Sequence, residues 1–509
     1  MGRARATRLV RGQPVDMRPS AVAPQSLADY LWHWEQTSPD RLFTSDGSGA
    51  RFTYLETAER VRALCAEFAR RGAVRGQHVA VLAENSSAWV IAFLAAIASG
   101  LVAVPLATRL STDELDAVLD DADPTLIAVD AGLLAKVAHR WGRRSVLIAD
   151  PYPPAAEHRS APTDGAAPAC LTYTSGTTGR PKGVMLSNAA LTHASETYAS
   201  MFHSTPKLHT IIAVPLCHNT GFIDQLGHAL VAGGSVEPHR RFHAGAIADA
   251  LQEGECSYFI GVPTMYHRIV DHLVGVLPCE RAPWLAFGGA PMPSQLIARM
   301  HQQFPRARLA NCYGLSEATS ITHINFLGRK SSTSAVGVAV AGTIDRISPS
   351  GELLIRSPTT MLGYHRDPSA TEAKFEDGWL RTGDLALRSA DGMVHVYGRV
   401  DEVINRGGEK VVPLEVEEAL RKHPSIVEAA VVGLPDDEYG SIVAAAVVTS
   451  GSMAPIDLVG FLDGALADFK RPAHIVQVDH LPRNDNGKVV TADVRDLIMR
   501  TRKSGGEQR

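Results

Sequence analysis

The stretch "WVIAFLAAIASGLVAVPLA", residues 89–107, decides the fold because it is almost wholly apolar and carries no charge. A membrane-spanning helix needs about 20 apolar residues in a row, but Ser99-Gly100 and Pro105 interrupt this stretch. Glycine often ends a helix, and short apolar β-branched runs form buried strands. The stretch therefore predicts a buried helix that ends at Gly100 and a strand over 101–105, with no membrane span.

Strands of the same kind are predicted on both sides of this stretch. Short apolar runs alternate with helical patterns such as "STDELDAVLDDA" (111–122), and this alternation indicates a largely parallel sheet covered by helices. The other runs in the first half of the chain are "HVAVLA" (78–83), "TLIAVD" (125–130), "SVLIAD" (145–150) and "CLTYT" (170–174). A second sheet is predicted from "TIIAVPL" (210–216), "SYFIGVP" (257–263) and "WLAFGGAP" (284–291).

The sequence changes character after about residue 336. Residues 336–400 contain short alternating runs separated by Gly, Pro and Asp, which predicts a small antiparallel β subdomain. Residues 401–509 have strand and helix patterns of their own and predict a small α+β domain. We therefore expect an α/β protein with a loose N-terminal tail over 1–24, a large N-terminal domain over 25–400 with two helix-covered, mostly parallel sheets, and a small C-terminal domain.

Composition narrows the class of protein. With 45% hydrophobic residues, 20% charged residues and a net charge of −4, the chain resembles an ordinary soluble globular protein without the basic excess of a nucleic-acid binder. The six cysteines are scattered without a CxxC pair, which indicates a reducing cytoplasm and no zinc site. The N-terminus "MGRARATRLVRGQPVDMRP" lacks the apolar segment of a secretory signal. Small molecules are the expected partners.

The loop "YTSGTTGRPKG" (173–183) is rich in glycine and hydroxyl residues. Glycine admits unusual backbone angles, so such a loop can direct N–H groups and hydroxyls at an anion such as phosphate. It differs from the nucleotide loop GxxxxGK[ST], because Pro181 stands where that pattern needs glycine. A solvated surface loop is the alternative interpretation. The phosphate-binding groups would be Thr174, Ser175, Gly176, Thr177, Thr178 and Lys182.

Four further motifs follow this loop along the chain: "NCYGLSEAT" (311–319), "WLRTGD" (379–384), "GRVDEVINRGGEKV" (398–411) and "LPRNDNGKV" (481–489). With the loop, they resemble the ordered core motifs of the adenylate-forming superfamily, which includes AMP-dependent synthetases and ligases, acyl-CoA synthetases, carrier-protein adenylation domains and beetle luciferases. The resemblance covers residues 25 to 500, roughly. It implies activation of a carboxylic acid by ATP to acyl-AMP with release of pyrophosphate, then transfer to a thiol. ATP, Mg²⁺ and CoA are the small molecules that it implies.

Electrostatic repulsion explains why this chemistry needs so many polar groups. A carboxylate and a triphosphate repel each other by on the order of 4 kcal/mol per close unit-charge pair at an effective dielectric near 20, so cations and aligned donors must surround both. The resemblance assigns the loop to the β- and γ-phosphates. It assigns Lys488 to the incoming carboxylate and the α-phosphate, where a compact ammonium is suitable. On sequence alone, Lys488 is a surface lysine in a hairpin turn.

The resemblance also implies a nucleotide site. Glu317 matches the carboxylate that holds Mg²⁺, and Tyr313 offers a ring on which adenine can stack. Asp384 matches the carboxylate that binds the ribose, with Arg399 as its basic companion. Without the resemblance, an Asp in "TGD" is a turn former. The other implied nucleotide contacts are Gly289, Ala290, Asn311, Gly314 and Ser316, the last of which stands where the family usually has threonine.

The remaining implied residues concern movement, the thiol and the acid. Asp401 matches the hinge about which a mobile C-terminal domain would swing, and Gly288 and Gly408 would leave room for the acid and for a pantetheine arm. The segment "PLCHNTGFIDQLGHALVAGG" (215–234) resembles the border of the acyl pocket, which places His218 and Asn219 beside the acid. A packed, hydrogen-bonded histidine is the alternative for His218.

The acyl segment also indicates the class of acid. It is mostly apolar and has no arginine for a second carboxylate, so we expect a fatty or similarly apolar monocarboxylic acid. An aromatic acid stays open because the His-Asn pair also occurs in aryl-acid activators. CoA is the preferred acceptor for a chain of stand-alone synthetase length, with a carrier protein as the alternative. More distant alternatives are a non-catalytic nucleotide-binding relative and a luciferase-like oxygenase, and we expect a monomer or a homodimer.

Overall fold

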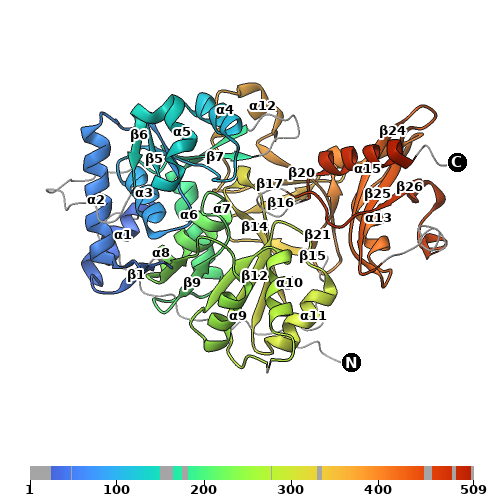
Figure 1. The fold of residues 1–509 in the computed structure, drawn as a ribbon, viewed down its shortest axis with the longest axis horizontal. Helices are drawn as coiled ribbons and strands as arrows, with labels where there is room; N and C mark the ends of the chain where they lie inside the picture. The colour runs from blue at the N-terminus through green and yellow to red at the C-terminus, as the bar shows by residue number, and fades with distance from the viewer. Residues whose placement is uncertain are drawn as a thin grey trace.

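The computed structural model describes residues 24–47, 49–148, 164–174, 182–276, 278–328, 335–451, 461–483 and 489–505. Two large sheets and a smaller C-terminal unit make up this part of the chain (Figure 1). Some sequence-based predictions lie outside the described residues: the N-terminal tail up to residue 23, and the site residues Ser175, Gly176, Thr177, Thr178 and Lys488.

The first sheet has seven strands in the order β18-β8-β7-β4-β3-β5-β6. The strands from β6 to β7 run parallel, whereas β8 and β18 join the edge in antiparallel fashion. Their bounds are β3 (His78–Leu82), β4 (Val102–Pro105), β5 (Leu126–Val129), β6 (Ser145–Leu147), β7 (Pro168–Thr174), β8 (Lys182–Ser187) and β18 (Gly363–Tyr364). This sheet agrees with the apolar runs of the first half of the chain, and β7 and β8 flank the predicted phosphate loop.

Helix α3 (Ser87–Ala98) confirms the prediction made from residues 89–107. Every side chain from Trp89 to Ala98 is buried, because the helix is covered on all sides rather than along one stripe. Gly100 has a φ of +67°, a value that glycine adopts without steric cost, and the chain then enters β4. None of the helices in the described part of the chain is both long and apolar enough to cross a membrane.

The second sheet has fourteen strands, in the order β16-β17-β20-β21-β15-β14-β13-β12-β11-β9-β10-β1-β2 with β19 paired to β20. The bounds of its first half are β1 (Leu42–Ser45), β2 (Arg51–Thr53), β9 (His209–Ile212), β10 (Ser235–Pro238), β11 (Tyr258–Gly261), β12 (Trp284–Gly288) and β13 (Arg308–Gly314). Those of its second half are β14 (Ile321–Leu327), β15 (Ala335–Ala339), β16 (Ile344–Ile347), β17 (Glu352–Arg356), β19 (Phe375–Glu376), β20 (Trp379–Arg388) and β21 (Val394–Arg399).

The antiparallel strands β15–β21 correspond to the β-rich stretch expected over 336–400. They continue the second sheet through β14, which pairs with both β13 and β15. The strands β9 to β13 are parallel. The continuity brings the motifs around Glu317 and Asp384 into one sheet. The expected α/β class, with mostly parallel sheets and a smaller C-terminal unit, is confirmed.

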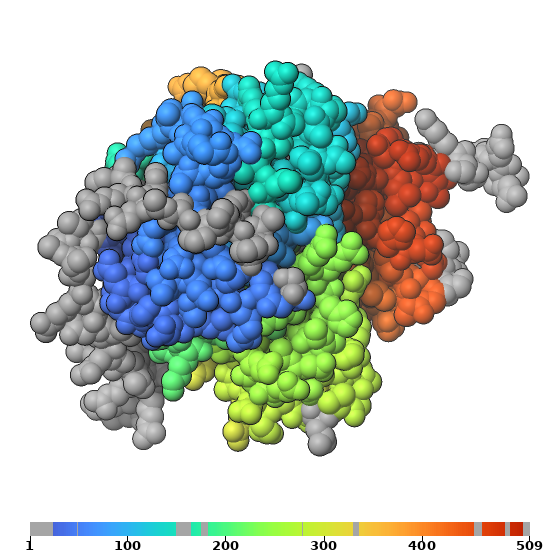
Figure 2. All heavy atoms as spheres, turned by 60° about the vertical axis from the view of Figure 1, so that its left-hand side comes forward, coloured from blue at the N-terminus to red at the C-terminus, as the bar shows by residue number. Residues whose placement is uncertain are grey.

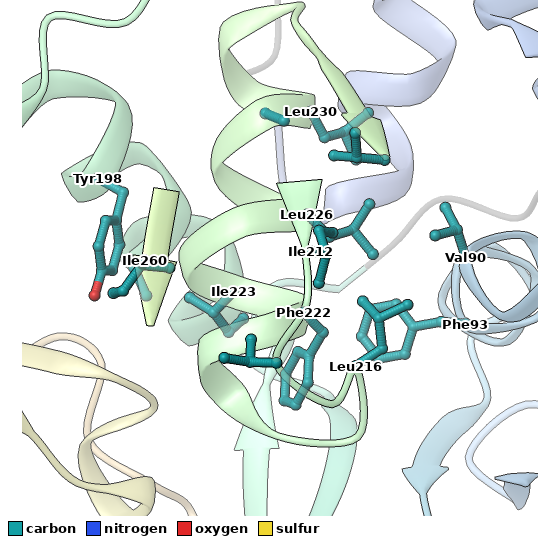
Figure 3. Packing of buried hydrophobic residues seen from close by; sticks show 14 of the residues in the cluster. Val90, Phe93, Tyr198, Ile212, Leu216, Phe222, Ile223, Leu226, Leu230 and Ile260 are labelled. Atoms are coloured by element: carbon teal, nitrogen blue, oxygen red, sulfur yellow. The ribbon is translucent and has the colours of Figure 1, made fainter. Parts of the chain in front are cut away.

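One apolar core joins the two sheets. It contains side chains of β3, β9 and β12 and of the helices between them. Figure 3 shows Phe93 of α3 facing Phe222, whose rings lie 5.3 Å apart, with Leu226 and Ile212 beside them. The helices of this large unit are α1 (Leu27–Thr37), α2 (Tyr54–Arg70), α4 (Thr112–Ala122), α5 (Leu134–Trp141), α6 (Asn188–Met201), α7 (Asn219–Gly221), α8 (His228–Ala232), α9 (Ala244–Glu253), α10 (Pro263–His272), α11 (Ser294–Gln303) and α12 (Pro368–Ala373).

The C-terminal unit is a small sheet with apolar clusters on both faces. Strands β24 (Ile426–Asp436) and β25 (Gly440–Thr449) are antiparallel, and β26 (His474–Gln477) adds to β25 in parallel. Helices α13 (Pro413–Leu420) and α15 (Thr491–Gly505) accompany it, after the short hairpin of β22 (Ile404–Arg406) and β23 (Glu409–Val411). Figure 2 shows this unit as a separate lobe beside the large one.

Candidate active site

The site is built at the carboxyl ends of β11, β12 and β13, where ligands of open α/β sheets gather. Gly288 ends β12 and Gly314 ends β13. A Cβ on Gly288 would lie 2.5 Å from the carbonyl oxygen of Cys312, and one on Gly314 would lie 1.8 Å from that of Ser320. These positions therefore require glycine, because backbone crosses backbone closely there. Gly289 follows with a φ of +77°, where a Cβ would lie 3.9 Å from Cγ1 of Val262, and Ala290 comes next.

The base of the predicted phosphate loop lies next to this edge. Thr174 and Lys182 are direct partners in the antiparallel pair β7–β8. The ammonium nitrogen of Lys182 lies 5.4 Å from the ring centroid of Tyr364, a cation–π distance. Tyr364 in turn pairs with Val184 through β18. The predicted phosphate loop thus connects two paired strands, β7 and β8, and Lys182 at its end lies beside the ring of Tyr364.

Glu317 lies in a short 3₁₀ helix, η4 (Ser316–Ala318), directly after β13. Its Oε1 accepts a hydrogen bond from the hydroxyl of Tyr364 at 2.7 Å and lies 3.6 Å from Nζ of Lys374. Its backbone carbonyl accepts the N–H of Met361 at 2.8 Å. Tyr364 and Lys374 belong to none of the motifs described above, so they could not be predicted from the sequence. Tyr364 links the phosphate-loop base to Glu317.

Asp384 is the centre of a second polar group. One oxygen accepts a hydrogen bond from the Tyr313 hydroxyl, and the other accepts Nη1 of Arg399 at 2.9 Å. Asp384 and Arg399 are direct partners in the pair β20–β21, which explains this contact. Arg399 also donates through Nε to Asp401 at 3.1 Å. The contact of Tyr313 with Asp384 is new, since the sequence indicated only a ring for adenine.

Two other nucleotide candidates have structural contacts. The side-chain amide of Asn311 donates to the carbonyl of Ala335 at 3.2 Å, so it braces β13 against β15. Ser316 opens η4, and its carbonyl accepts the N–H of Thr319 at 3.0 Å. Both residues lie within the same short stretch as Tyr313 and Glu317. The roles of these residues toward the base and the phosphates stay predictions.

His218 and Asn219 lie at the start of the helix formed by α7, η3 (Phe222–Gly227) and α8. Nε2 of His218 is buried and has no hydrogen-bond partner among the described residues. Burial lowers the pKa of His218 to about 4, so the imidazole is neutral at pH 7. The amide of Asn219 donates to the carbonyl of Thr319, two residues after Glu317. Asn219 therefore connects the acyl segment with the η4 turn.

Asp224 is a buried carboxyl that the sequence reading missed. It lies in η3, whose π-helical turn is of a kind often found at functional sites. Its Oδ1 accepts a hydrogen bond from the hydroxyl of Ser320. Burial raises the pKa of Asp224 to about 7, and hydrogen bonds from Ser320, Tyr198 and Thr220 oppose that rise. The signal in the sequence was a single acid within an apolar helix, "GFIDQLGHALVAGG".

The structure thus brings most predicted residues into one connected region. Contacts link Lys182 through Tyr364 to Glu317, link the η4 turn to Asn219, and link Tyr313 through Asp384 and Arg399 to Asp401. Gly408 lies apart from this set, in the turn between β22 and β23 with a φ of +95° and open space around it.

Comparisons with known proteins agree with this arrangement. The model described as "AMP-binding enzyme" matches residues 31–365, which is more than half of the chain. The chain belongs to the AMP-binding enzyme family. The model of the C-terminal domain of AMP-binding enzymes matches residues 415–488.

Relatives of this AMP-binding enzyme are similar along nearly their whole length. Oxalate–CoA ligase of Arabidopsis thaliana is 30% identical over 91% of this chain and 97% of the relative. Feruloyl-CoA synthase of an Amycolatopsis species is 31% identical over 88% and 94%. The structure of o-succinylbenzoate CoA synthetase from Bacillus subtilis with its acyl-adenylate intermediate has a TM-score of 0.83 and 27% identity over 92% and 98%. The same enzyme with ATP and magnesium ion has a TM-score of 0.82 and 26% identity over 92% and 99%.

Proposed function

We propose that this AMP-binding enzyme activates an aromatic monocarboxylic acid as its acyl-adenylate and transfers the acyl group to CoA. The coarser activity follows from the family and from relatives named as CoA ligases and synthetases. The chain is an acid–thiol ligase that acts through an acyl-adenylate and uses ATP, Mg²⁺ and CoA. A carrier protein as acceptor stays an alternative that no observation favours.

The choice of acid rests on the relatives and on the acyl segment. The expectation of a fatty acid gains no support, because feruloyl and o-succinylbenzoyl groups are aromatic. Segment 215–234 contains neither lysine nor arginine for a second carboxylate, which favours a feruloyl-like monocarboxylic acid over oxalate or a succinylbenzoate. Nε2 of the neutral His218 has no hydrogen-bond partner in the described part of the chain, which fits a hydrogen bond to the carboxyl or to a ring substituent of the acid.

The observation that carries the proposal is the contact chain around Gly314. Tyr313 and Asp384 lie on one side of it, and Glu317 with Tyr364 and Lys182 lies on the other. A nucleotide that spans this edge would place its ribose by Asp384 and its phosphates by Lys182 and Thr174. These groups come from distant parts of the chain and meet at the edge where we place the nucleotide.

The donor set at Glu317 fits magnesium. Mg²⁺ is usually bound through one or two carboxylates together with substrate phosphates and water, so one largely buried carboxylate beside a phosphate loop suffices. Glu317 would hold the ion, and Ser316 would add a hydroxyl for phosphate. When bound, the ion neutralises phosphate charge that would repel the incoming carboxylate.

The chain's own residues then perform the two half-reactions. Asp384, oriented by Tyr313 and Arg399, would bind both ribose hydroxyls and hold the α-phosphorus in place. Lys488 would draw the acid's carboxylate oxygen to that phosphorus, and pyrophosphate would leave toward Thr174 and Lys182. His218, neutral at pH 7, adds no charge to the acid's path. The C-terminal unit would then rotate at Asp401 and admit the thiol of CoA past Gly408. The thiol would attack the acyl carbon, and AMP would leave.

Pyrophosphate release tests this proposal. The protein is incubated with ATP, MgCl₂ and CoA and with a panel of cinnamic, benzoic, arylacetic and fatty acids, and products are identified by mass. We expect the largest kcat/KM with an aromatic monocarboxylic acid and a product mass equal to its CoA thioester. Turnover of fatty acids alone would overturn the choice of acid. Pyrophosphate release that does not depend on any acid of the panel would overturn the proposed function.

A further inference from the structure

Thr319 has a backbone conformation that a β-branched residue rarely adopts. Its φ is +65° and its ψ is −47°, and the residue is fully buried. The other positive-φ residues with side chains in the described ranges are Asp123, His203, Arg366 and Asp377, none of them β-branched. Such a conformation is strained and persists only where its surroundings impose it.

Contacts from two separate parts of the chain hold this residue. Its hydroxyl donates to the carbonyl of Thr359 at 2.6 Å, and its carbonyl accepts the amide of Asn219. The next residue, Ser320, donates its hydroxyl to Asp224. The turn also closes on itself, since the N–H of Leu315 donates to the carbonyl of Ser320 at 3.2 Å. We call residues 315–320 the Glu317 turn.

The acyl segment (215–234) therefore makes hydrogen bonds to two successive residues of the Glu317 turn. Asn219 and Asp224 lie one helical turn apart on the helix that begins at His218, and they contact Thr319 and Ser320. Glu317 lies within the same turn, where its side chain contacts Tyr364 beside Lys182. A shift of the helix that moves Asn219 must move the Thr319 carbonyl, and a packed turn of this kind changes as a unit.

We propose that Thr319 is a positioning residue: when the acid binds, Thr319 transmits the effect to the Glu317 turn and orients the Glu317 carboxylate to bind MgATP. The proposal rests on the function proposed above, because it takes the Asn219 side as the acid site and the Glu317 side as the nucleotide site. Binding of the acid and of MgATP is then mutually favourable, and the same factor applies in both directions. Substituting Thr319 uncouples the two sites without removing a group that touches either substrate.

The test measures KM for MgATP at low and at saturating acid in the full-length enzyme. We expect acid to lower that KM by about 5-fold or more in the wild type, in the usual range for coupled sites. We call the ratio of KM for MgATP at low acid to that at saturating acid the factor. Thr319→Val keeps the branched shape and loses the hydrogen bond to Thr359, so this factor should fall toward 1. Thr319→Ser keeps the hydroxyl and should retain the wild-type factor. The melting temperature without ligands is recorded for each variant.

Two further variants keep the proposal falsifiable. Thr44→Val is the matched control: Thr44 is also fully buried and has a hydroxyl contact, to Ser87 at 3.0 Å, but lies in β1. It should lower the melting temperature and leave the factor unchanged. If Thr319→Val does not fold, Asn219→Ala, which loses the contact to the Thr319 carbonyl, should also bring the factor toward 1. The proposal would be overturned if every folded variant kept the wild-type factor. It would also be overturned if an active wild-type enzyme showed a factor of 1. Lack of acid-dependent turnover in the wild type would instead overturn the proposed function.

Discussion

The proposed nucleotide side and the proposed acid side of this site are built differently. On the nucleotide side, Asp384 and Glu317 are largely buried carboxylates that already have donors from Tyr313, Arg399 and Tyr364. On the acid side, Asp224 and the Nε2 atom of His218 are buried, and desolvation displaces the pKa values of these two residues to about 7 and about 4. The nucleotide is the same in every turnover, so its contacts can be preformed. The acid side is an apolar enclosure with few polar groups, which suits discrimination among acids.

The largest effect is expected at Lys488, the residue assigned to both sides. Lys488→Ala should lower acyl-adenylate formation by about 10³-fold, in the range found when one preorganised group that stabilises developing charge is removed. Thioester formation from supplied acyl-AMP should be spared. Pyrophosphate release and thioester formation are measured separately, and equal loss of both half-reactions would contradict the assignment.

Asp384→Asn tests the nucleotide side. Asparagine keeps one oxygen acceptor but loses the charge that strengthens the bond to Arg399 and the proposed bonds to the ribose. A loss of about 1.5–3 kcal/mol in these interactions should lower kcat/KM for ATP by up to about 100-fold. KM for the acid at saturating ATP should stay near the wild-type value. Asp120→Asn is the control, because it alters an exposed ion pair between Asp120 on α4 and Arg140 on α5. A variant whose defect appears in the KM of the acid rather than of ATP would contradict the division into two sides.

The comparison also separates what the sequence predicts from what it does not. Apolar runs predicted α3 and the parallel strands, because burial of such runs is decided locally. The motifs pointed to Glu317, Asp384 and Arg399, which carry the charges of the nucleotide side. Tyr364 and Lys374 escaped notice, because they meet Glu317 only through the pairing of β18 with β8.

The acid side was harder to predict for a physical reason. A lone Asp224 in an apolar helix is visible in the sequence, but its partners Ser320 and Tyr198 come from distant elements. The positive φ of Thr319 follows from contacts with Asn219 and Thr359, not from its own preference. Continuity of β15–β21 with the second sheet is likewise a matter of non-local pairing.

Asp224→Asn sharpens the acid side. The pKa of Asp224 is raised above its unfolded value, so its contribution to stability is greatest at low pH and is lost as pH rises through about 7. Between pH 5 and pH 7, the free energy of unfolding of the wild type should fall relative to the variant by about 2 kcal/mol. Urea unfolding at both pH values measures this difference. A constant difference would show that Asp224 does not change its proton affinity on folding.

His218→Gln gives the smallest expected effect and the opposite sign. The pKa of His218 is lowered in the folded protein, so its contribution is present above pH 6.5 and is lost as pH falls toward 4. From pH 7 to pH 5 the free energy of unfolding of the wild type should fall by about 1.5 kcal/mol relative to the variant, as measured by urea unfolding. In the wild type, a histidine resonance absent from His218→Gln should not titrate between pH 6 and pH 8. Titration near 6.5 would place His218 in water rather than in the enclosed acid side.

The central claim is that the acid's own oxygen attacks the α-phosphorus of ATP at the edge where the two sides meet. The direct measurement uses an acid that carries ¹⁸O in both carboxylate positions, with ATP, MgCl₂ and CoA, and mass analysis of the nucleotide product. The account predicts AMP that contains one ¹⁸O atom and pyrophosphate that contains none. Formation of ADP, or of AMP without the label, would contradict it.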